Sequence, residues 1–305
     1  MTIDFIGPEA ETCLTWDGIT AALEAGHGLP PAQIDDTFLY RDSDTLLSRA
    51  AWIDGMGIAV KSATIFPGNA ARQVPTINGA VSLFSDGEGR LEAVIDFHLV
   101  TRWKTAGDSL LAARRLARPD SREILIVGAG TVARSMIEAY ASTFPEARFS
   151  IWNRSPAAAH ALAAAFPAAE AVADLEAAVR KADIIATATM ARAPVLEGEW
   201  VRPGTHVDLI GAYRPDMREA DDTLLRRASL YVDSRATTIG HIGEIADPIA
   251  RGVISESDVR ADFYDIPKGL FTRRSASEIT VAKNGGGAHL DLMTSRYILS
   301  AWRAR

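Results

Sequence analysis

The sequence predicts an α/β protein in which a doubly wound parallel-sheet domain is inserted into an α+β domain. From residue 123 to about 235, short apolar strands alternate with helical segments, which is the pattern of a parallel sheet. The N-terminal part is mixed, and a final helical stretch over 289–302 is expected to return to it. We therefore expect one domain made of residues 1–118 plus 287–305 and a second domain made of residues 119–286.

The elements follow from apolar periodicity and turn residues. In the first domain we expect helices at 14–25 and 105–116, a strand at 33–41, a strand preceded by a glycine turn within 52–63, and a β-hairpin with strands at 80–84 and 91–95. In the second domain we expect strands at 123–128, 148–153, 169–173, 183–188, 205–210 and 229–233, with helices at 157–165 and 174–181 among them.

A glycine turn follows the first strand of the expected parallel sheet. Gly128 permits a tight turn, Gly130 lets the backbone approach a pyrophosphate, and the small Ala133 lets the next helix pack on the strand. The N–H groups that begin this helix, at Thr131 and Val132, then face the phosphates. The order of strand, turn, helix and second strand favours a Rossmann dinucleotide site over a glycine turn in some other α/β protein.

The second strand ends where a Rossmann domain contacts the adenine ribose. An acidic residue at this point would bind the ribose 2′-OH of NAD, but the chain carries Asn153, Arg154 and Ser155. A guanidinium suits the 2′-phosphate of NADP, so we expect NADP(H) to be preferred while NAD(H) stays possible. Thr187 and Thr189 follow the fourth strand, where they line the cofactor or simply cap the strand end.

Composition excludes several classes of protein. The chain has 305 residues, 48% of them hydrophobic, and a net charge of −7, so it has no overall basic field to attract nucleic acid. No apolar run approaches the roughly 20 residues of a membrane span. The single cysteine, Cys13, fits a reducing compartment, and we expect a cytoplasmic protein. The six histidines lack metal-ligand spacing, so no metal site is expected.

Four basic residues are candidates for binding an anionic substrate. Lys61 ends an apolar strand, where it could bind a carboxylate, donate a proton, or extend to solvent. Lys104 lies at the expected start of a helix, where a cation opposes the dipole, so either an anionic ligand or a solvated turn explains it. Arg41 and Arg49 precede Lys61, and each could clamp a carboxylate or lie on the surface.

Several segments together resemble the ornithine cyclodeaminase/μ-crystallin family. They occur in order over residues 40–295: Lys61 with Pro67-Gly68-Asn69, Leu99-Val100-Thr101 with Lys104-Thr105-Ala106, Gly128 to Ala133, Trp152-Asn153-Arg154, Gly243-Glu244, and Glu278-Ile279-Thr280 leading into Lys283-Asn284-Gly285. The resemblance implies a homodimer formed through the first domain. It also implies that Lys61 is the active-site lysine, that Arg41 lies near a carboxylate-binding arginine, and that Asn284 contacts the cofactor.

The chain departs from the family pattern at three places. Lys104 stands where the family usually has an arginine. The lysine keeps the positive charge but lacks the planar guanidinium group that binds a carboxylate through two hydrogen bonds. Tyr213 replaces an acidic residue after Gly211-Ala212, and Ser48 or Arg49 stands where cyclodeaminases have an acid upstream of the lysine. Both carboxylates associated with cyclodeamination thus look absent.

We therefore expect NAD(P)H-dependent reduction of a small α-imino acid, such as Δ1-pyrroline-2-carboxylate, Δ1-piperideine-2-carboxylate or a linear imino acid. Lys61, Lys104 and either Arg41 or Arg49 would bind its carboxylate, with a water or Tyr213 near the imine nitrogen. The alternatives are cyclodeamination of ornithine or lysine, an alanine-dehydrogenase-like activity, and a non-catalytic NADPH-dependent ligand-binding protein.

Overall fold

The structure is a computed structural model, and it describes residues 2–305. The chain forms two compact units, one of Met1–Gly107 with Gly287–Arg305 and the other of Asp108–Gly286. The division falls inside a single helix, α2 (Phe97–Leu116). The division expected at residue 118 lies just past the end of the same helix.

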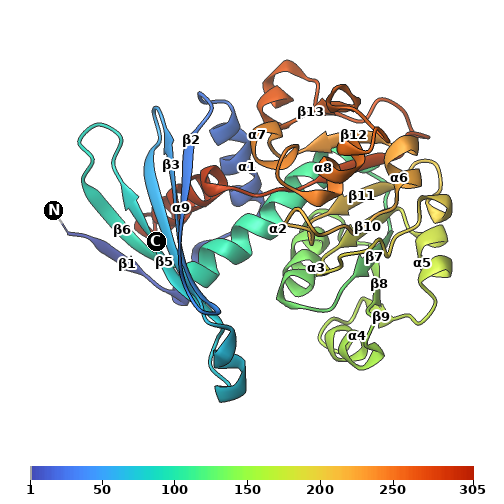
Figure 1. The fold of residues 1–305 in the computed structure, drawn as a ribbon, viewed down its shortest axis with the longest axis horizontal. Helices are drawn as coiled ribbons and strands as arrows, with labels where there is room; N and C mark the ends of the chain where they lie inside the picture. The colour runs from blue at the N-terminus through green and yellow to red at the C-terminus, as the bar shows by residue number, and fades with distance from the viewer. Residues whose placement is uncertain (1) are drawn as a thin grey trace. The chain divides into compact units, whose positions relative to one another are not determined.

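The first unit is built on a six-stranded sheet in the order β1-β6-β5-β4-β3-β2. Only β1 and β6 pair in parallel, and the other neighbours are antiparallel. Helix α9 lies along β3, β4 and β5 and also packs against α1 (Figure 1). The elements are β1 (Asp4–Ile6), α1 (Trp16–His27), β2 (Gln33–Arg41), β3 (Asp44–Ile53), β4 (Gly57–Ile65), β5 (Ile77–Phe84), β6 (Leu91–Asp96), the first part of α2, and α9 (Ala288–Arg303).

The turn and strand expected within 52–63 are present, with positive φ angles of 85° at Gly55 and 112° at Gly57, but Trp52 belongs to β3, a strand that was not expected. Helix α2 begins at Phe97 rather than at residue 105. Oδ1 of Asp96 accepts a hydrogen bond from the N–H of Leu99 at 2.7 Å and so satisfies a donor of the first turn. The helix-dipole argument for Lys104 therefore does not apply, because this residue lies well inside the helix.

The second unit holds eight parallel strands in the order β13-β12-β14-β11-β10-β7-β8-β9. The order reverses direction between β7 and β10, as it does in a doubly wound sheet. All six expected strands are present, whereas β13 and β14 were not expected. The elements are β7 (Glu123–Val127), α3 (Thr131–Thr143), β8 (Arg148–Trp152), α4 (Pro156–Ala163), β9 (Ala169–Ala171), α5 (Leu175–Lys181), β10 (Ile184–Thr187), β11 (His206–Leu209), α6 (Asp222–Arg227), β12 (Ser229–Val232), α7 (Arg235–Thr238), α8 (Gly243–Ala250), β13 (Val259–Ala261) and β14 (Thr280–Lys283).

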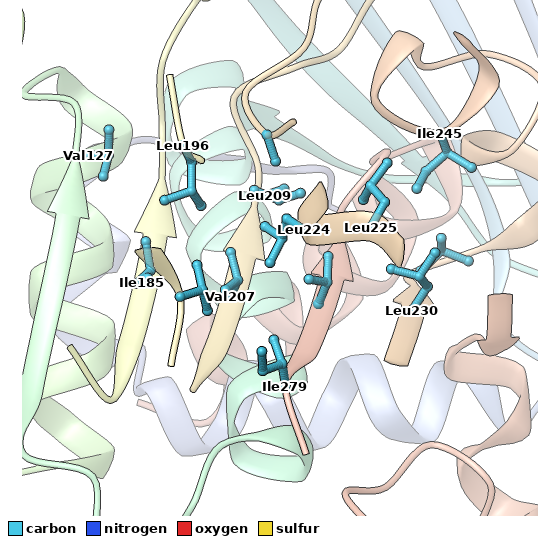
Figure 2. Close-up of a cluster of buried hydrophobic side chains, with 14 of the residues drawn as sticks. Val127, Ile185, Leu196, Val207, Leu209, Leu224, Leu225, Leu230, Ile245 and Ile279 are labelled. Carbon is cyan, nitrogen blue, oxygen red and sulfur yellow. The ribbon is translucent and has the colours of Figure 1, made fainter. Parts of the chain in front are cut away.

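Both faces of the parallel sheet are covered by apolar side chains. Along β7, Leu125 and Val127 enter one buried cluster, while Ile124 and Ile126 enter another cluster on the opposite face. Figure 2 shows the first cluster, to which side chains of β7, β10, β11 and β12 contribute together with Leu224 and Leu225 of α6. Burial on two faces is the physical reason why these strands are continuous apolar runs in the sequence.

Candidate functional site

The turn after β7 has the geometry that a dinucleotide requires. Gly128 has a φ of 121°, and a Cβ placed on it would lie 2.6 Å from the carbonyl oxygen of Ala188. Gly130 is the N-cap of α3, and a Cβ there would meet no other atom of residues 2–305 within 4 Å. Thr131 and Val132 begin the helix, whose first N–H groups have no intrahelical acceptor. The backbone is thus open to a phosphate at the start of a 13-residue helix.

An open groove continues from this turn along the carboxyl ends of the strands. Arg154 is exposed at its edge, and Nδ2 of the adjacent Asn153 donates to the carbonyl of Ser155 at 3.1 Å. Ser155 is the N-cap of α4. These residues leave the Arg154 guanidinium beside the groove. The groove is lined by Gly128, Ala129, Gly130, Trp152, Asn153, Arg154, Ala188, Thr189, Met190, Ala191 and Val195.

One buried carboxylate, that of Glu219, joins the loops after β10 and β11. It accepts hydrogen bonds from Oγ1 of Thr187 at 2.8 Å and from both N and Oγ1 of Thr189 at 2.8 and 2.7 Å. It also accepts the N–H groups of Gly211 at 2.6 Å and of Ala212 at 3.3 Å. The hydroxyls of Thr187 and Thr189, which were expected either to line the cofactor or to cap the strand end, are directed to Glu219, and Thr189 also lines the groove.

A second buried acid and a buried lysine interact with the charge of Glu219. The Glu244 carboxylate accepts the N–H groups of Glu219 and Ala220 at 2.7 and 3.0 Å. Burial and the neighbouring Glu219 raise the pKa of Glu244 to about 7. Nζ of Lys283 donates to the carbonyls of Leu209 and Asn284, each at 2.7 Å. This network holds three strand ends in place beside the groove.

Asn284 keeps a free acceptor. It is buried at the end of β14, and its Nδ2 lies 3.5 Å from Oγ of Ser109. Its Oδ1 has no hydrogen-bond partner among residues 2–305. A buried amide oxygen without a partner is costly, so this atom suits a donor on a bound group.

The first unit carries a row of charges across three neighbouring strands. Asp36 of β2 lies opposite Arg49 of β3, and Arg49 lies opposite Lys61 of β4, so the three side chains share one face of the sheet. The Arg49 guanidinium binds both oxygens of Asp36, with Nε 3.2 Å from Oδ1. The positive charge of Arg49 is thus balanced by Asp36, which lies on the strand opposite to that of Lys61.

Two lysines meet at one carboxylate oxygen. Lys61 and Lys104 are only 5% and 8% exposed, and their Nζ atoms lie 3.0 and 3.2 Å from Oδ1 of Asp291 in α9. Lys61 also donates to Oγ1 of Thr101 at 2.9 Å, and its Nζ lies 4.4 Å from the centroid of the Phe97 ring. We call Asp36, Arg49, Lys61, Lys104 and Asp291 the cationic cluster.

Burial and the surrounding charges set the ionisation of the cationic cluster. Burial lowers the pKa of Lys61 to about 8. The Asp291 carboxylate opposes this shift, whereas Lys104 and Arg49 add to it. Burial alone would raise the pKa of Asp291, but the ammonium groups of Lys104 and Lys61 bring it below its ordinary value. Asp291 is therefore ionised near neutral pH, and Lys61 remains mostly protonated below pH 8.

Three of the four predicted basic residues come together, and Arg41 does not join them. Arg41 lies at the tip of the β2–β3 hairpin, where it pairs with Asp44 at 2.9 Å and its side chain is 75% exposed. Tyr213 follows β11 in the second unit, is 54% exposed, and lies beside the Arg214 guanidinium at 5.8 Å. Their proposed roles stay predictions.

Asp291 was not predicted from the sequence as a site residue. The expected final helix contains it as an acidic residue between Leu290 and Leu292, and both neighbours are fully buried. A lone carboxylate inside an apolar helical run is rarely tolerated without a partner, and this was the available signal.

Comparison with known proteins places the chain in a family. The model of the Ornithine cyclodeaminase/mu-crystallin family matches residues 51–305. The chain belongs to this family. It is 55% identical over 291 residues to Delta(1)-pyrroline-2-carboxylate reductase of Paracoccus denitrificans. The aligned part covers 93% of this chain and 92% of the relative.

Two solved structures of similar proteins match the whole fold. One is Delta(1)-pyrroline-2-carboxylate reductase of Thermococcus litoralis in complex with NADH and L-proline, with a TM-score of 0.90, 25% identity, and coverage of 99% of this chain and 98% of that one. The other is an archaeal alanine dehydrogenase dimer with bound NAD, with a TM-score of 0.89, 28% identity, and coverage of 100% and 97%. The expected family and the expected Rossmann α/β fold are confirmed.

Residues 2–305 contain no group of three or more His, Cys, Asp or Glu side chains that could hold a metal ion. Within the same residues, every helix is too short or too polar to cross a bilayer.

Proposed function

We propose that this family member reduces a small α-imino acid to the amino acid with a nicotinamide cofactor. The observation that carries the proposal is the pair of buried ammonium groups, Lys61 and Lys104, held at one oxygen of Asp291. Buried cations that outnumber their carboxylate partners suit an anionic ligand. The reductase names of the similar proteins support the same chemistry.

In the proposed reaction, the imine C=N bond gains a hydride at carbon and a proton at nitrogen. NADPH, when bound, supplies the hydride and becomes NADP⁺. Lys61 and Lys104 bind the carboxylate next to the imine carbon, which fixes the orientation of the C=N bond and removes the entropic cost of alignment. The cations belong at the carboxylate end, because a positive charge against the nitrogen would oppose protonation of the imine.

A comparison of two substrates tests this proposal. We expect NADPH absorbance to fall rapidly with Δ1-pyrroline-2-carboxylate, and we expect no ammonia release from ornithine with either nicotinamide cofactor. Release of ammonia from ornithine without net change of the cofactor would instead support cyclodeamination.

We further propose that NADPH is preferred to NADH and that Arg154 is the reason. Replacing Arg154 by alanine should weaken NADPH binding about tenfold, because a guanidinium–phosphate hydrogen bond is charge-assisted and a tenfold change corresponds to about 1.4 kcal/mol. NADH binding, measured by the same fluorescence titration, should change much less. Arg148→Ala, at the opposite end of β8, is the matched control. Equal losses of both cofactors in Arg154→Ala would contradict this role.

We also propose a homodimer formed through the first unit. Large apolar side chains are exposed on its sheet: Leu39 of β2 is 62% exposed, Trp52 and Leu46 of β3 are 46% and 39% exposed, and Phe5 of β1, at the opposite edge, is 74% exposed. Apolar patches of this kind mark association surfaces, and a second copy of the chain is the partner we propose. Trp52→Glu should convert a dimer into a monomer in light scattering, whereas Leu270→Glu in the second unit should not. A wild-type monomer at micromolar concentration would contradict the proposal.

A further inference from the structure

We propose that Asp291 determines substrate charge: it leaves the cationic cluster with a single uncompensated positive charge, so that the site selects imino acids with one carboxylate. This inference rests on the proposed function and adds a substrate class to it. Asp291 acts as a positioning and specificity residue, since it touches the two lysines that would bind the substrate.

The geometry shows how one carboxylate serves two lysines. Nζ of Lys61 and Nζ of Lys104 both lie within 3.2 Å of Oδ1 of Asp291, although the lysines come from β4 and α2. Without the shared oxygen, two buried ammonium groups would repel each other across a region of low dielectric constant. Oδ2 of Asp291 has no hydrogen-bond partner in residues 2–305, so it makes no further neutral contact that would compete with this role.

The charge count follows from the pairings. Arg49 is paired with Asp36, and one of the two lysines is balanced by Asp291. The two buried histidines near the cluster, His289 of α9 and His27 of α1, add no charge near neutral pH. Burial lowers the pKa of His289 well below its ordinary value, with nearby His27 and Lys104 adding to the effect. Burial likewise lowers the pKa of His27 to about 4. One positive charge remains.

One remaining charge matches one substrate carboxylate. A second carboxylate bound against this cluster would be buried without a cation of its own, which is strongly unfavourable. Removing the charge of Asp291 frees the second lysine and should admit a dicarboxylate. Because Asp291 raises the pKa of Lys61, its loss also favours the neutral amine of Lys61, so the comparison has to be made at pH 6, where Lys61 keeps its proton more readily.

The test measures binding of two stable planar analogues, pyrrole-2-carboxylate and pyrrole-2,5-dicarboxylate, by calorimetry with NADP⁺ at pH 6. In the wild type we expect the monocarboxylate to bind at least tenfold more tightly. Asp291→Asn should shift the ratio of the two dissociation constants at least tenfold towards the dicarboxylate, and Asp291→Glu, which keeps the charge, should largely retain the wild-type ratio. Glu88→Gln removes one negative charge from an exposed pair with Arg90, outside the cluster, and should leave the ratio unchanged.

An unchanged ratio in Asp291→Asn would overturn the inference. So would equal or tighter binding of the dicarboxylate by the wild type, a result that requires no variant to fold. An effect of the same size in Glu88→Gln would show that the ratio follows the net charge of the protein, and this would overturn the inference as well. Binding does not depend on turnover, so failure of the wild type to reduce an imine would count against the proposed function and would be seen in a separate assay.

Discussion

Replacing Lys61 by alanine is expected to lower kcat/KM for Δ1-pyrroline-2-carboxylate by about 100-fold or more. The change removes the ammonium group that contacts Asp291 and Thr101. The substrate carboxylate would then be bound by Lys104 without Lys61, and the imine carbon would be displaced from the position in which it reacts. Misplacing a reacting group by about 1 Å is enough for a loss of roughly 100-fold. Steady-state rates followed by NADPH absorbance measure the effect.

The control for this variant is Lys181→Ala, which removes an exposed lysine that pairs with Glu123 in the second unit. Its kcat/KM should stay within twofold of the wild type. Cofactor binding by Lys61→Ala should also be normal, since Lys61 belongs to the other unit. Near-normal turnover of Lys61→Ala would exclude Lys61 from substrate binding.

Replacing Glu219 by alanine is expected to lower the free energy of unfolding by about 3 kcal/mol. The N–H groups of Thr189, Gly211 and Ala212 would lose their acceptor, and a buried donor left without a partner costs about 1–3 kcal/mol. Because the donors are close together, a water that enters the space would recover part of the loss. Urea unfolding of the variant and the wild type measures the difference.

Glu199→Ala is the matched control for Glu219→Ala, because this side chain is exposed in the same part of the chain. Its stability should lie within about 0.5 kcal/mol of the wild type. If Glu219→Ala were as stable as that control, the Glu219 carboxylate would not be what joins the two loops.

The parallel-sheet domain could be predicted because its signals are local. The glycine turn at 128–130 and the apolar strands around it occupy neighbouring positions, and each strand is buried on both faces. Strands β13 and β14 escaped prediction because they lie after residue 235, in a region without regular alternation; their length is not the reason, since β9 to β12 are equally short. Their strand conformation depends on pairing with β12, which no short window of sequence shows.

The candidate site could be predicted residue by residue but not as an assembly. Lys61, Lys104 and Arg49 were recognisable as cations in unusual places. That Arg49 faces Lys61 depends on the register of β3 and β4, which the sequence analysis did not predict because it missed β3. The β2–β3 hairpin carries Arg41 to its tip through the turn at Asp42, which has a φ of 51°.

Asp291 shows more clearly what could not be predicted from the sequence. It contacts Lys61 across 230 positions of sequence, and this contact exists only because α9 returns to the sheet of the first unit. The return of the last helix was expected, but the face that it presents to the sheet was not. Its place between two leucines marks Asp291 as a buried acid, but no local pattern shows that Lys61 is its partner.

The most direct test of imino acid reduction is the stoichiometry of the wild-type reaction with Δ1-pyrroline-2-carboxylate. Purified protein, NADPH and the imine should give one proline for each NADPH oxidised, with the product measured by chromatography and the cofactor by absorbance. The account predicts a ratio of one and rapid turnover near neutral pH. Tight NADPH binding with no proline formed from this imine or from the six-membered and linear α-imino acids would contradict it.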